Sequence, residues 1–437
     1  MMVQGPGFRV HRRWSTRPIT LFMRLGLSIA ALLLLSATAG GQKRIILLIG
    51  DGVGVSYWTL ARFAADDLAV SRFKVLGLVD TRASNTLITD SAAGATAFAS
   101  GIRTLNGAVG VGPDSQPAET VLEAAKKKGW ATGLVATSSI ADATPAAFAS
   151  HVPSRSQLHD IARQMTDLGV DVVLGGGAQL FNAATRPDGA DLMGQWGRTH
   201  TVVTDAASLD AARDTSTRRL VGLFTPGHMP HAAERSPTLP VMTRKAIEVL
   251  SRDPDGFFLM VEGSQPDWRG HDNMPLGAVL AEMLDFDAAI GAALEYQQRQ
   301  PDVLILVVAD HETGGLALET ARDSAVLQTA ANALTEAVRS LARALGLLSR
   351  QAADSADSAA IRMEITSARL SAQAKGARTE RLVADYTTIG HTAQMVPLFA
   401  SGPGAEAFAG MIDNHRVGQL LLEIVRRPPA PARRRRK

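Results

Sequence analysis

The 437-residue sequence contains no cysteine and few aromatic residues, 5% of the total. The lack of cysteine excludes disulfide bonds, thiolate catalysis, thiolate zinc sites and lipid attachment at a thiol. No interior segment reaches the roughly 18–20 apolar residues of a membrane-spanning helix. Glycine is plentiful, with 39 residues, and it suits tight strand-to-helix turns better than an aromatic-rich β-sandwich. With 46% hydrophobic residues, the chain can bury a large core.

The first 39 residues carry five arginines and no acidic side chain. An apolar run from Leu25 to Leu35 is followed by Ala37-Thr38-Ala39, the small-residue pattern of a cleavage site. We therefore predict a signal peptide over residues 1–39 and an exported protein, periplasmic or secreted, with no stable membrane span after cleavage. An uncleaved anchor is the rival interpretation, although the run is short for one. Arg12-Arg13 leaves twin-arginine export open.

The formal net charge of +3 comes from the two ends of the chain. Subtracting the five leader arginines leaves −2, and subtracting the seven basic residues at positions 426–437 leaves −9. The body is therefore acidic, which argues against binding of nucleic acid through a basic face. An acidic body is what many carboxylate metal ligands would produce. Residues 426–437 combine proline with a basic run, so we predict a disordered tail.

Short apolar runs alternate with helix-like stretches along the body. The runs cover residues 44–49, 131–137, 170–174, 257–261 and 303–309, and the helix-like stretches cover 91–100, 118–128, 155–168 and 242–251. This alternation predicts an α/β fold, a doubly wound and mostly parallel sheet flanked by helices, with ligands at the carboxyl ends of the strands. We predict one catalytic domain over 40–425. Two segments look like insertions, a polar, irregular one at about 181–219 and a helical one at about 320–381; a last strand and helix follow at 395–400 and 414–425.

Three of the apolar runs lead directly into acidic residues. These are Asp51, Glu262 and Asp310, the last followed by His311. Any one of these acids alone could be a helix cap or a turn residue. If the three strands are neighbours, however, the carboxylates converge at one sheet edge, where they repel one another unless cations neutralise them. Together with His311 they favour a metal centre.

Two further features lie near these acids. Asp267 and His271 are four residues apart, so both can face one ion across a helical turn, and oxygen–nitrogen ligation suits zinc. This spacing is common, and only its closeness to Glu262 makes it informative. Ser91 stands where a helix of small residues begins, and helix N-termini attract anions such as phosphate. Ser91 could be a simple N-cap; as a nucleophile it would need activation, which zinc can supply without a histidine general base.

Six short motifs, in consistent order over roughly residues 43–425, resemble the alkaline phosphatase family. They are Gly-Asp-Gly around Asp51, Asp-Ser-Ala-Ala around Ser91, Ala-Asp-Ala-Thr-Pro at 141–145, Val-Glu-Gly-Ser-Gln at 261–265, Asp-His-Glu-Thr-Gly-Gly at 310–315 and Gly-His-Thr at 390–392. The resemblance implies hydrolysis of small-molecule phosphate monoesters, and it makes a homodimer an expectation.

The resemblance also implies roles for particular residues. Ser91 would be the nucleophile that forms a phosphoserine intermediate, and Arg155 would clamp two phosphate oxygens, for which its planar guanidinium is suited. Two zinc ions would activate the nucleophile, the leaving group and water, with a magnesium ion nearby. One zinc would be held by Asp267, His271 and His391, the other by Asp51, Asp310 and His311, and the magnesium by Asp51, Thr144 and Glu262, with Asp142 acting through water.

The sequence departs from some family members at two positions. Trp268 stands where some carry lysine, and Asp142 where others carry histidine, so the third site could hold magnesium or a third zinc. A phosphodiesterase of the same superfamily and a non-catalytic metal- or phosphate-binding protein remain alternatives. His228 and His231 lie in a segment without a nearby acid pair, and for them we predict a surface loop near the mouth of the site rather than another metal site.

Overall fold

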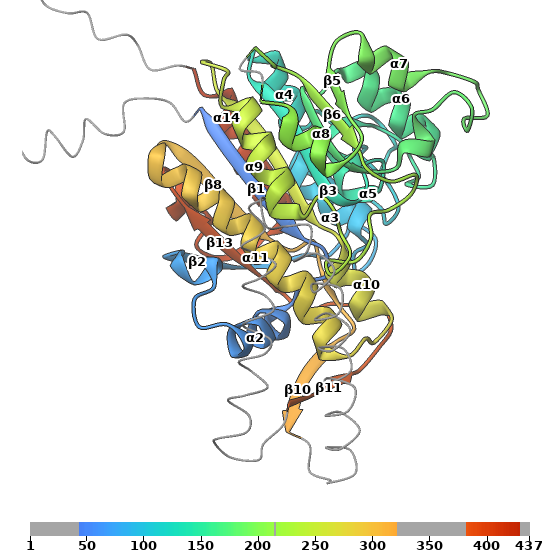
Figure 1. Ribbon diagram of the computed structural model, residues 1–437. Coiled ribbons are helices and arrows are strands. Elements are labelled where there is room, and N and C mark those ends of the chain that lie inside the picture. The colour runs from blue at the N-terminus through green and yellow to red at the C-terminus, as the bar shows by residue number, and fades with distance from the viewer. Residues whose placement is uncertain (1–42, 214–215, 321–381, 429–437) are drawn as a thin grey trace, which may run out of the picture. The chain divides into compact units, whose positions relative to one another are not determined.

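The computed structural model describes residues 43–213, 216–320 and 382–428. The predicted signal peptide, most of the predicted insertion at 320–381 and residues 429–437 of the predicted tail lie outside the described residues. The described part is built on a ten-stranded sheet in the order β14-β2-β13-β8-β1-β7-β3-β4-β6-β5 (Figure 1). Neighbouring strands run parallel except at β13 (Val396–Ser401), which is antiparallel to both neighbours. The predicted mostly parallel α/β sheet is confirmed.

The strands that matter for the site lie in the middle of this sheet. These are β1 (Arg44–Gly50), β7 (Phe257–Gly263), β8 (Val303–Val308) and β3 (Ala131–Ser139). Beyond β3 follow β4 (Val172–Gly176), β6 (Leu220–Leu223) and β5 (Thr201–Val203), and beyond β13 follow β2 (Val75–Asp80) and β14 (Gly410–Asp413). Two small antiparallel sheets pair β9 (Glu312–Thr313) with β12 (His391–Thr392) and β10 (Leu316–Thr320) with β11 (Leu382–Tyr386).

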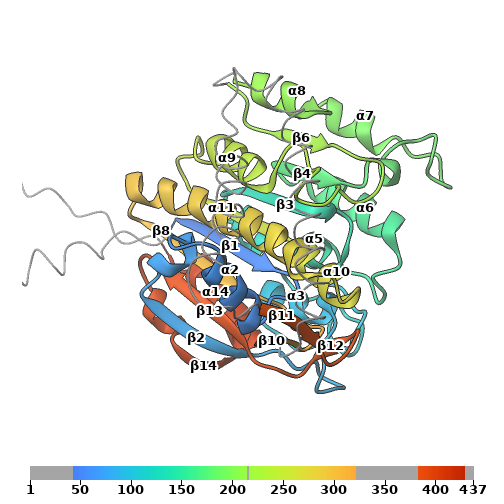
Figure 2. The ribbon, with the colours of Figure 1, turned by 60° about the horizontal axis from the view of Figure 1, so that its bottom comes forward.

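Helices cover both faces of the sheet (Figures 1 and 2). One face carries α2 (Val55–Ala64), α9 (Leu239–Leu250) and α11 (Leu276–Arg299), and the other carries α3 (Ser91–Ser100), α4 (Val121–Lys127), α5 (Ala143–Ala149), α6 (Leu158–Leu168) and α14 (Asn414–Arg426). The shorter helices are η1 (Ala69–Arg72), η2 (Ala178–Leu180), α7 (Leu192–Gly197), α8 (Ala206–Ala211), α10 (Gln265–His271) and η3 (Ala405–Phe408). Among the described helices, none is long and apolar enough to cross a bilayer.

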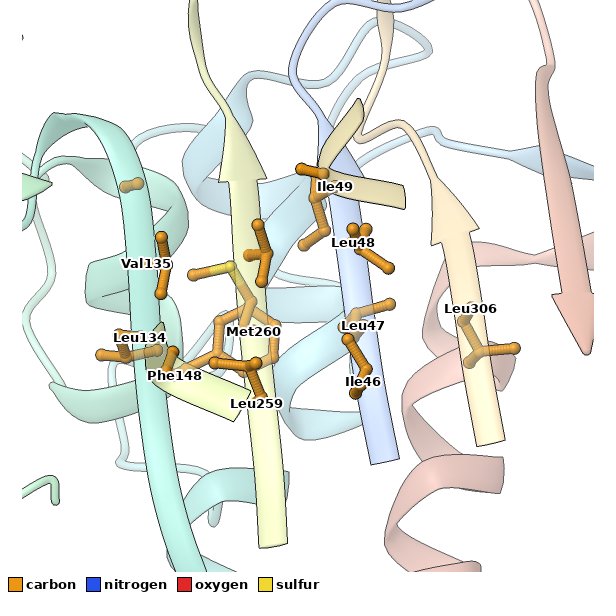
Figure 3. Packing of buried hydrophobic residues seen from close by; sticks show 14 of the residues in the cluster. Ile46, Leu47, Leu48, Ile49, Leu134, Val135, Phe148, Leu259, Met260 and Leu306 are labelled. Carbon is orange, nitrogen blue, oxygen red and sulfur yellow. The ribbon is translucent and has the colours of Figure 1, made fainter. Parts of the chain in front are cut away.

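Because both faces are covered, the central strands are mostly buried and rich in apolar residues. All five residues from Ile45 to Ile49 are fully buried, and their side chains pack beside those of β7, β3 and β8 (Figure 3). Burial of one such side chain contributes roughly 1.5–3 kcal/mol. The register pairs Gly50 with Gly263 and Ile49 with Val308, so β1, β7 and β8 end at the same level.

The described part of the segment 181–219 is only partly irregular, because regular elements lie within it. It contains α7, β5 and α8, and β5 extends the main sheet as its outermost strand. Trp196 is buried and stacks on Phe181 at 4.7 Å between ring centroids. The elements were missed because each spans only three to six residues, which is too short for a hydrophobic period to stand out.

Candidate active site

The three acids stand at the carboxyl ends of three adjacent strands. Asp51 follows β1, Glu262 lies near the end of β7, and Asp310 comes two residues after β8. All are buried. The Gly52 amide donates to Asp310 Oδ1 at 3.2 Å and so ties two of these ends together. Gly52 has φ of +73°, and a Cβ there would lie 2.7 Å from the Asp267 Cα, so the turn after β1 requires glycine.

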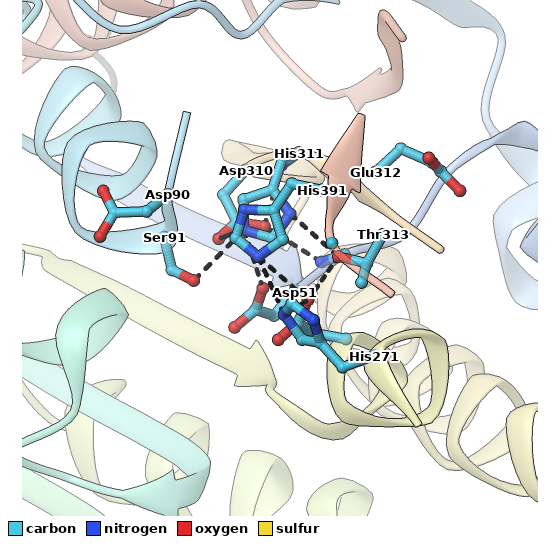
Figure 4. A network of polar contacts seen from close by, with 12 residues as sticks. Asp51, Asp90, Ser91, His271, Asp310, His311, Glu312, Thr313 and His391 are labelled. Carbon is cyan, nitrogen blue, oxygen red and sulfur yellow. Dashed lines mark hydrogen bonds and ion pairs between the residues drawn. The ribbon is translucent and has the colours of Figure 1, made fainter. Parts of the chain in front are cut away.

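Ser91 is the first residue of α3. The Asp90 carboxylate caps this helix by accepting from the Ala93 amide at 3.0 Å. The small residues after Ser91 let α3 lie against the end of β8; a Cβ at Gly94 would be 3.1 Å from the Cβ of Asp310. This packing places Ser91 Oγ 3.2 Å from His311 Nε2 (Figure 4).

Two histidines direct their Nε2 atoms at one another. His271 Nδ1 donates to the Ile389 carbonyl at 2.6 Å, and His391 Nδ1 donates to the Thr89 carbonyl at 2.8 Å. The two Nε2 atoms are 3.0 Å apart, and they lie 3.4 Å and 3.7 Å from Asp267 Oδ1. With both rings neutral, their lone pairs face each other, and a cation between them would turn this repulsion into ligation.

The second group centres on His311. The Thr313 hydroxyl donates to Asp267, so His311 Nδ1 donates to the Thr313 oxygen at 3.2 Å. The free Nε2 then faces Asp51 Oδ1 at 3.5 Å and Asp310 Oδ2 at 3.4 Å. Both oxygens are buried without a hydrogen-bond partner in the part of the chain that the structure describes. Buried carboxylate oxygens that lack a hydrogen-bond donor are stabilised by a bound cation or by a proton.

The protonation of these groups follows from their burial. Burial, reinforced by the charge of Asp310, raises the pKa of Asp51 well above its ordinary value. Burial and the neighbouring His391 lower the pKa of His311 to about 3, so its imidazole is neutral. Without cations the carboxylates would tend to hold protons, whereas bound cations would keep them ionised.

The donor atoms form two sets, each within 4.8 Å. One set is Asp267, His311 and His391, and the other is Asp51, Asp310 and His311. The sequence-based assignment gave His311 to the second set alone, whereas the geometry places it in both, with its ring stacked on His391 at 3.5 Å. Carboxylate oxygens with neutral imidazole nitrogens suit zinc, so the residues present fit a two-metal centre.

The predicted magnesium ligands lie beside this centre but are less tightly gathered. Burial and the charge of Asp142 raise the pKa of Glu262 to about 8, although Ser138 donates a hydrogen bond to it at 3.3 Å. The hydroxyl of Thr144, on the first turn of α5, is buried and has no hydrogen-bond partner among the described residues. Within the described ranges, the carboxylates of Asp51, Asp142 and Glu262 do not form a cluster like the two above.

Arg155 reaches toward the capped end of α3. Its guanidinium donates to Asp90 Oδ2 at 3.2 Å and to Asp142 Oδ1 at 3.1 Å. Burial alone would lower the pKa of Arg155, but the charges of Asp142 and Asp90 outweigh it and raise the pKa above its ordinary value. The side chain is thus a cation bonded to Asp90, the residue before Ser91.

Sequence reasoning assigned no role to two residues that shape this site, Asp90 and Thr313. Asp90 caps α3 and holds Arg155, and Thr313 orients both Asp267 and His311. The only signal was their position inside the quoted motifs.

His228 and His231 lie in the loop after β6, and their contacts reach the helix that carries Asp267.

A comparison with protein families matches residues 42–426 to the alkaline phosphatase model. The chain belongs to the alkaline phosphatase family. It is therefore an enzyme of a metal-dependent family, a phosphoric monoester hydrolase. Alkaline phosphatase 3 of Bacillus subtilis strain 168 is 35% identical over 88% of this chain and 89% of its own length.

Solved alkaline phosphatases share the fold. The enzyme from the Antarctic bacterium TAB5 is 32% identical, covering 88% of this chain and 98% of its own, with a TM-score of 0.72. A histidine-to-aspartate variant of that enzyme was solved with magnesium in its M3 site. The enzyme of Thermus thermophilus is 27% identical, covering 90% of this chain and 94% of its own, with a TM-score of 0.71.

Proposed function

We propose that the chain hydrolyses phosphate monoesters through a phosphoserine intermediate on Ser91. The observation that carries this proposal is the position of Ser91 Oγ, 3.2 Å from the Nε2 of His311, a residue shared by two groups of metal-type donors. The phosphorus–oxygen bond to the leaving alcohol breaks as a bond to Ser91 Oγ forms. Water then attacks the phosphorus, releases inorganic phosphate and regenerates the serine.

Two zinc ions and one magnesium ion complete the site in this proposal. Asp267, His271 and His391 would hold one zinc, and Asp51, Asp310 and His311 the other, with His311 near both. Asp51, Thr144 and Glu262 would hold magnesium, with Asp142 acting through water. When bound, such ions lower the pKa of a coordinated hydroxyl or water and neutralise charge on the transferred group.

The remaining chemistry belongs to the chain itself. Ser91 is the first residue of α3, and the N-terminus of this helix would favour the negative charge of a phosphate bound there. Arg155 can turn its planar guanidinium from Asp90 and Asp142 toward two phosphate oxygens. Phosphoryl transfer depends mainly on such positioning and charge stabilisation, which is consistent with His311, whose lowered pKa makes it a weak general base.

A serine variant with a matched control tests the intermediate. Ser91→Ala should lose turnover and the mass increase of one phosphoryl group seen after acid quenching, while it retains zinc. Ser100→Ala changes the other end of the same helix, where the hydroxyl donates to the Ala118 carbonyl, and should keep both. Turnover and labelling of Ser91→Ala at the wild-type level would contradict the proposal.

The type of ester can be tested separately. A monoesterase should hydrolyse p-nitrophenyl phosphate far faster than bis(p-nitrophenyl) phosphate. The reverse preference would indicate a phosphodiesterase, and turnover of neither would indicate a binding protein.

Export and assembly are part of the same proposal. The arginine-rich leader and the Ala37-Thr38-Ala39 pattern support export to the periplasm or the medium. Sequencing of the mature N-terminus tests cleavage after Ala39, and light scattering tests the homodimer expected from the family.

A further inference from the structure

The loop between β6 and α9 carries the two histidines that the mechanism does not use. We propose that this loop, residues 225–235, positions α10, and that Gln265 and His231 are positioning residues for the metal centre. The proposal rests on the proposed function, because α10 carries Asp267 and His271. The contacts of the loop would keep the two α10 ligands of one metal ion in a fixed position.

Gln265 is the first residue of α10, and its side chain is fully buried. Its amide nitrogen donates to the Met229 carbonyl at 2.8 Å and to the Thr137 carbonyl at 3.0 Å. Because carbonyls only accept, these bonds fix the amide orientation, and Gln265 Oε1 must be the acceptor for His231 Nδ1 at 2.9 Å. The start of α10 is therefore bonded both to the end of β3 and to the loop.

His231 also contacts the next turn of the helix. Arg269 Nη2 lies 2.6 Å from His231 Nδ1 and 3.2 Å from its Nε2. A guanidinium only donates, and Nδ1 already donates to Gln265, so Nε2 is the ring atom that can accept from Arg269. Arg269 is buried, and its Nε has no partner among the described residues, so the imidazole is one of the few polar groups that contact this guanidinium. His231 thus bridges residues i and i+4 of α10.

His231 contacts α10 on the face opposite to the metal ligands Asp267 and His271. At about 100° per residue, Gln265 and Arg269 lie within about 40° of each other on one face of α10. Asp267 and His271 lie about 200° and about 240° from Gln265 by the same count. His228 adds a third contact, an edge-to-face packing on Trp268 with ring centroids 4.7 Å apart. The loop therefore fixes the rotation of α10 without touching the donor atoms.

The loop is itself anchored on both sides. At one side the Gly177 amide donates to the Gly227 carbonyl at 2.6 Å. At the other, Arg235 Nε donates to the Pro230 carbonyl at 3.1 Å, and its remaining nitrogens pair with the buried carboxylates of Glu282 and Asp285 on α11. A loop held in this way can act as a fixed reference for a helix of only seven residues.

The effect should be confined to one of the two zinc ions. Asp267 and His271 both lie on α10, and the His271 side chain is 37% exposed, so small movements of the helix change their spacing. Asp51 and Asp310 follow β1 and β8, which are central strands of the sheet. Loss of supporting partners around metal ligands commonly costs about 10–100-fold in affinity.

Zinc release to a coloured chelator measures this directly in the mature, zinc-loaded protein. His231→Phe keeps an aromatic ring but loses both hydrogen bonds, and one of the two zinc equivalents should leave roughly 10–100-fold faster. His231→Asn places an amide N–H where Nδ1 stood and should restore most of the wild-type rate. Arg269→Met, which removes the other partner, should act in the same direction as His231→Phe. His415→Phe on α14 is the matched control and should release zinc as the wild type does.

Two outcomes of the zinc-release experiment would overturn the proposal. Equal acceleration of both equivalents together with a lower melting temperature would show a general structural role and overturn it. Unchanged release from both His231→Phe and Arg269→Met would overturn it as well. A wild-type protein that binds no zinc would instead refute the proposed metal centre, so the two failures are distinguishable.

Discussion

Removal of the metal ions should make the stability of the protein depend on pH through Glu262. Burial and the charge of Asp142 raise the pKa of this carboxyl from 4.5 to about 8 when no cation is present. Between these values the folded protein binds more protons than the unfolded chain, so its stability falls as the pH rises. The stabilisation is complete below about pH 4.5 and lost above about pH 8, and the 3.5-unit span corresponds to about 5 kcal/mol.

Roughly 3 kcal/mol of this loss falls between pH 6 and pH 9. Burial raises the pKa of Asp51 in the same sense, whereas the lowered pKa of His311 acts in the opposite sense up to about pH 6.5. Urea unfolding of the chelated protein at several pH values, followed by circular dichroism, measures the loss. The zinc- and magnesium-loaded protein should not show it, because cations keep the carboxylates ionised.

Two variants separate Glu262 from the rest of the chain. Glu262→Gln cannot titrate and should remove about 3 kcal/mol of the pH dependence of the metal-free protein. Glu406→Gln changes an exposed acid in η3 and should leave the dependence intact. Equal stability of the metal-free wild type at pH 6 and pH 9 would refute the reasoning.

Three further substitutions test the site and its support. Arg155→Ala removes two charge-assisted hydrogen bonds to phosphate, each worth roughly 1.5–3 kcal/mol, so kcat/KM for p-nitrophenyl phosphate should fall at least about 100-fold; Arg155→Lys should recover part of it. Gly94→Val forces α3 away from Asp310 and should lower both turnover and melting temperature, at a cost of about 1–3 kcal/mol. Gly291→Ala is its control, because a Cβ there meets only an ordinary contact at 3.6 Å. Arg235→Met leaves two buried carboxylates unpaired and should cost about 3–5 kcal/mol in urea unfolding at neutral pH.

The sequence was sufficient to predict that the acids meet, because the relevant signal is local. An apolar run that leads into Asp51, Glu262 or Asp310 is the pattern of a buried parallel strand with a polar residue at its carboxyl end. The three strands are indeed neighbours, with β1 between β7 and β8. The order of strands was not predicted, since it depends on packing between segments far apart in the sequence, such as Gly52 and Asp310, which are 258 positions apart.

The residues that position the metal ligands could not be predicted either, because their partners also come from distant parts of the sequence. Thr313 orients His311 only because β9, which follows β8, lies next to α10, which carries Asp267. His231 bonds to Gln265 across 34 positions of sequence, and neither residue carries a local signal. A residue type shows what a side chain can donate or accept, whereas its partner is set by the fold.

The metal centre and the fold are linked through the same side chains. With no cysteine in the sequence, no disulfide can stabilise the chain. Asp51, Glu262 and Asp310 are nevertheless buried at the junction of the three central strands, where ionised carboxylates without cations would destabilise the core. Cations that bind only the folded protein would offset this cost and stabilise it by mass action. The acids that the proposed reaction requires would therefore also make the stability of the fold depend on its metals.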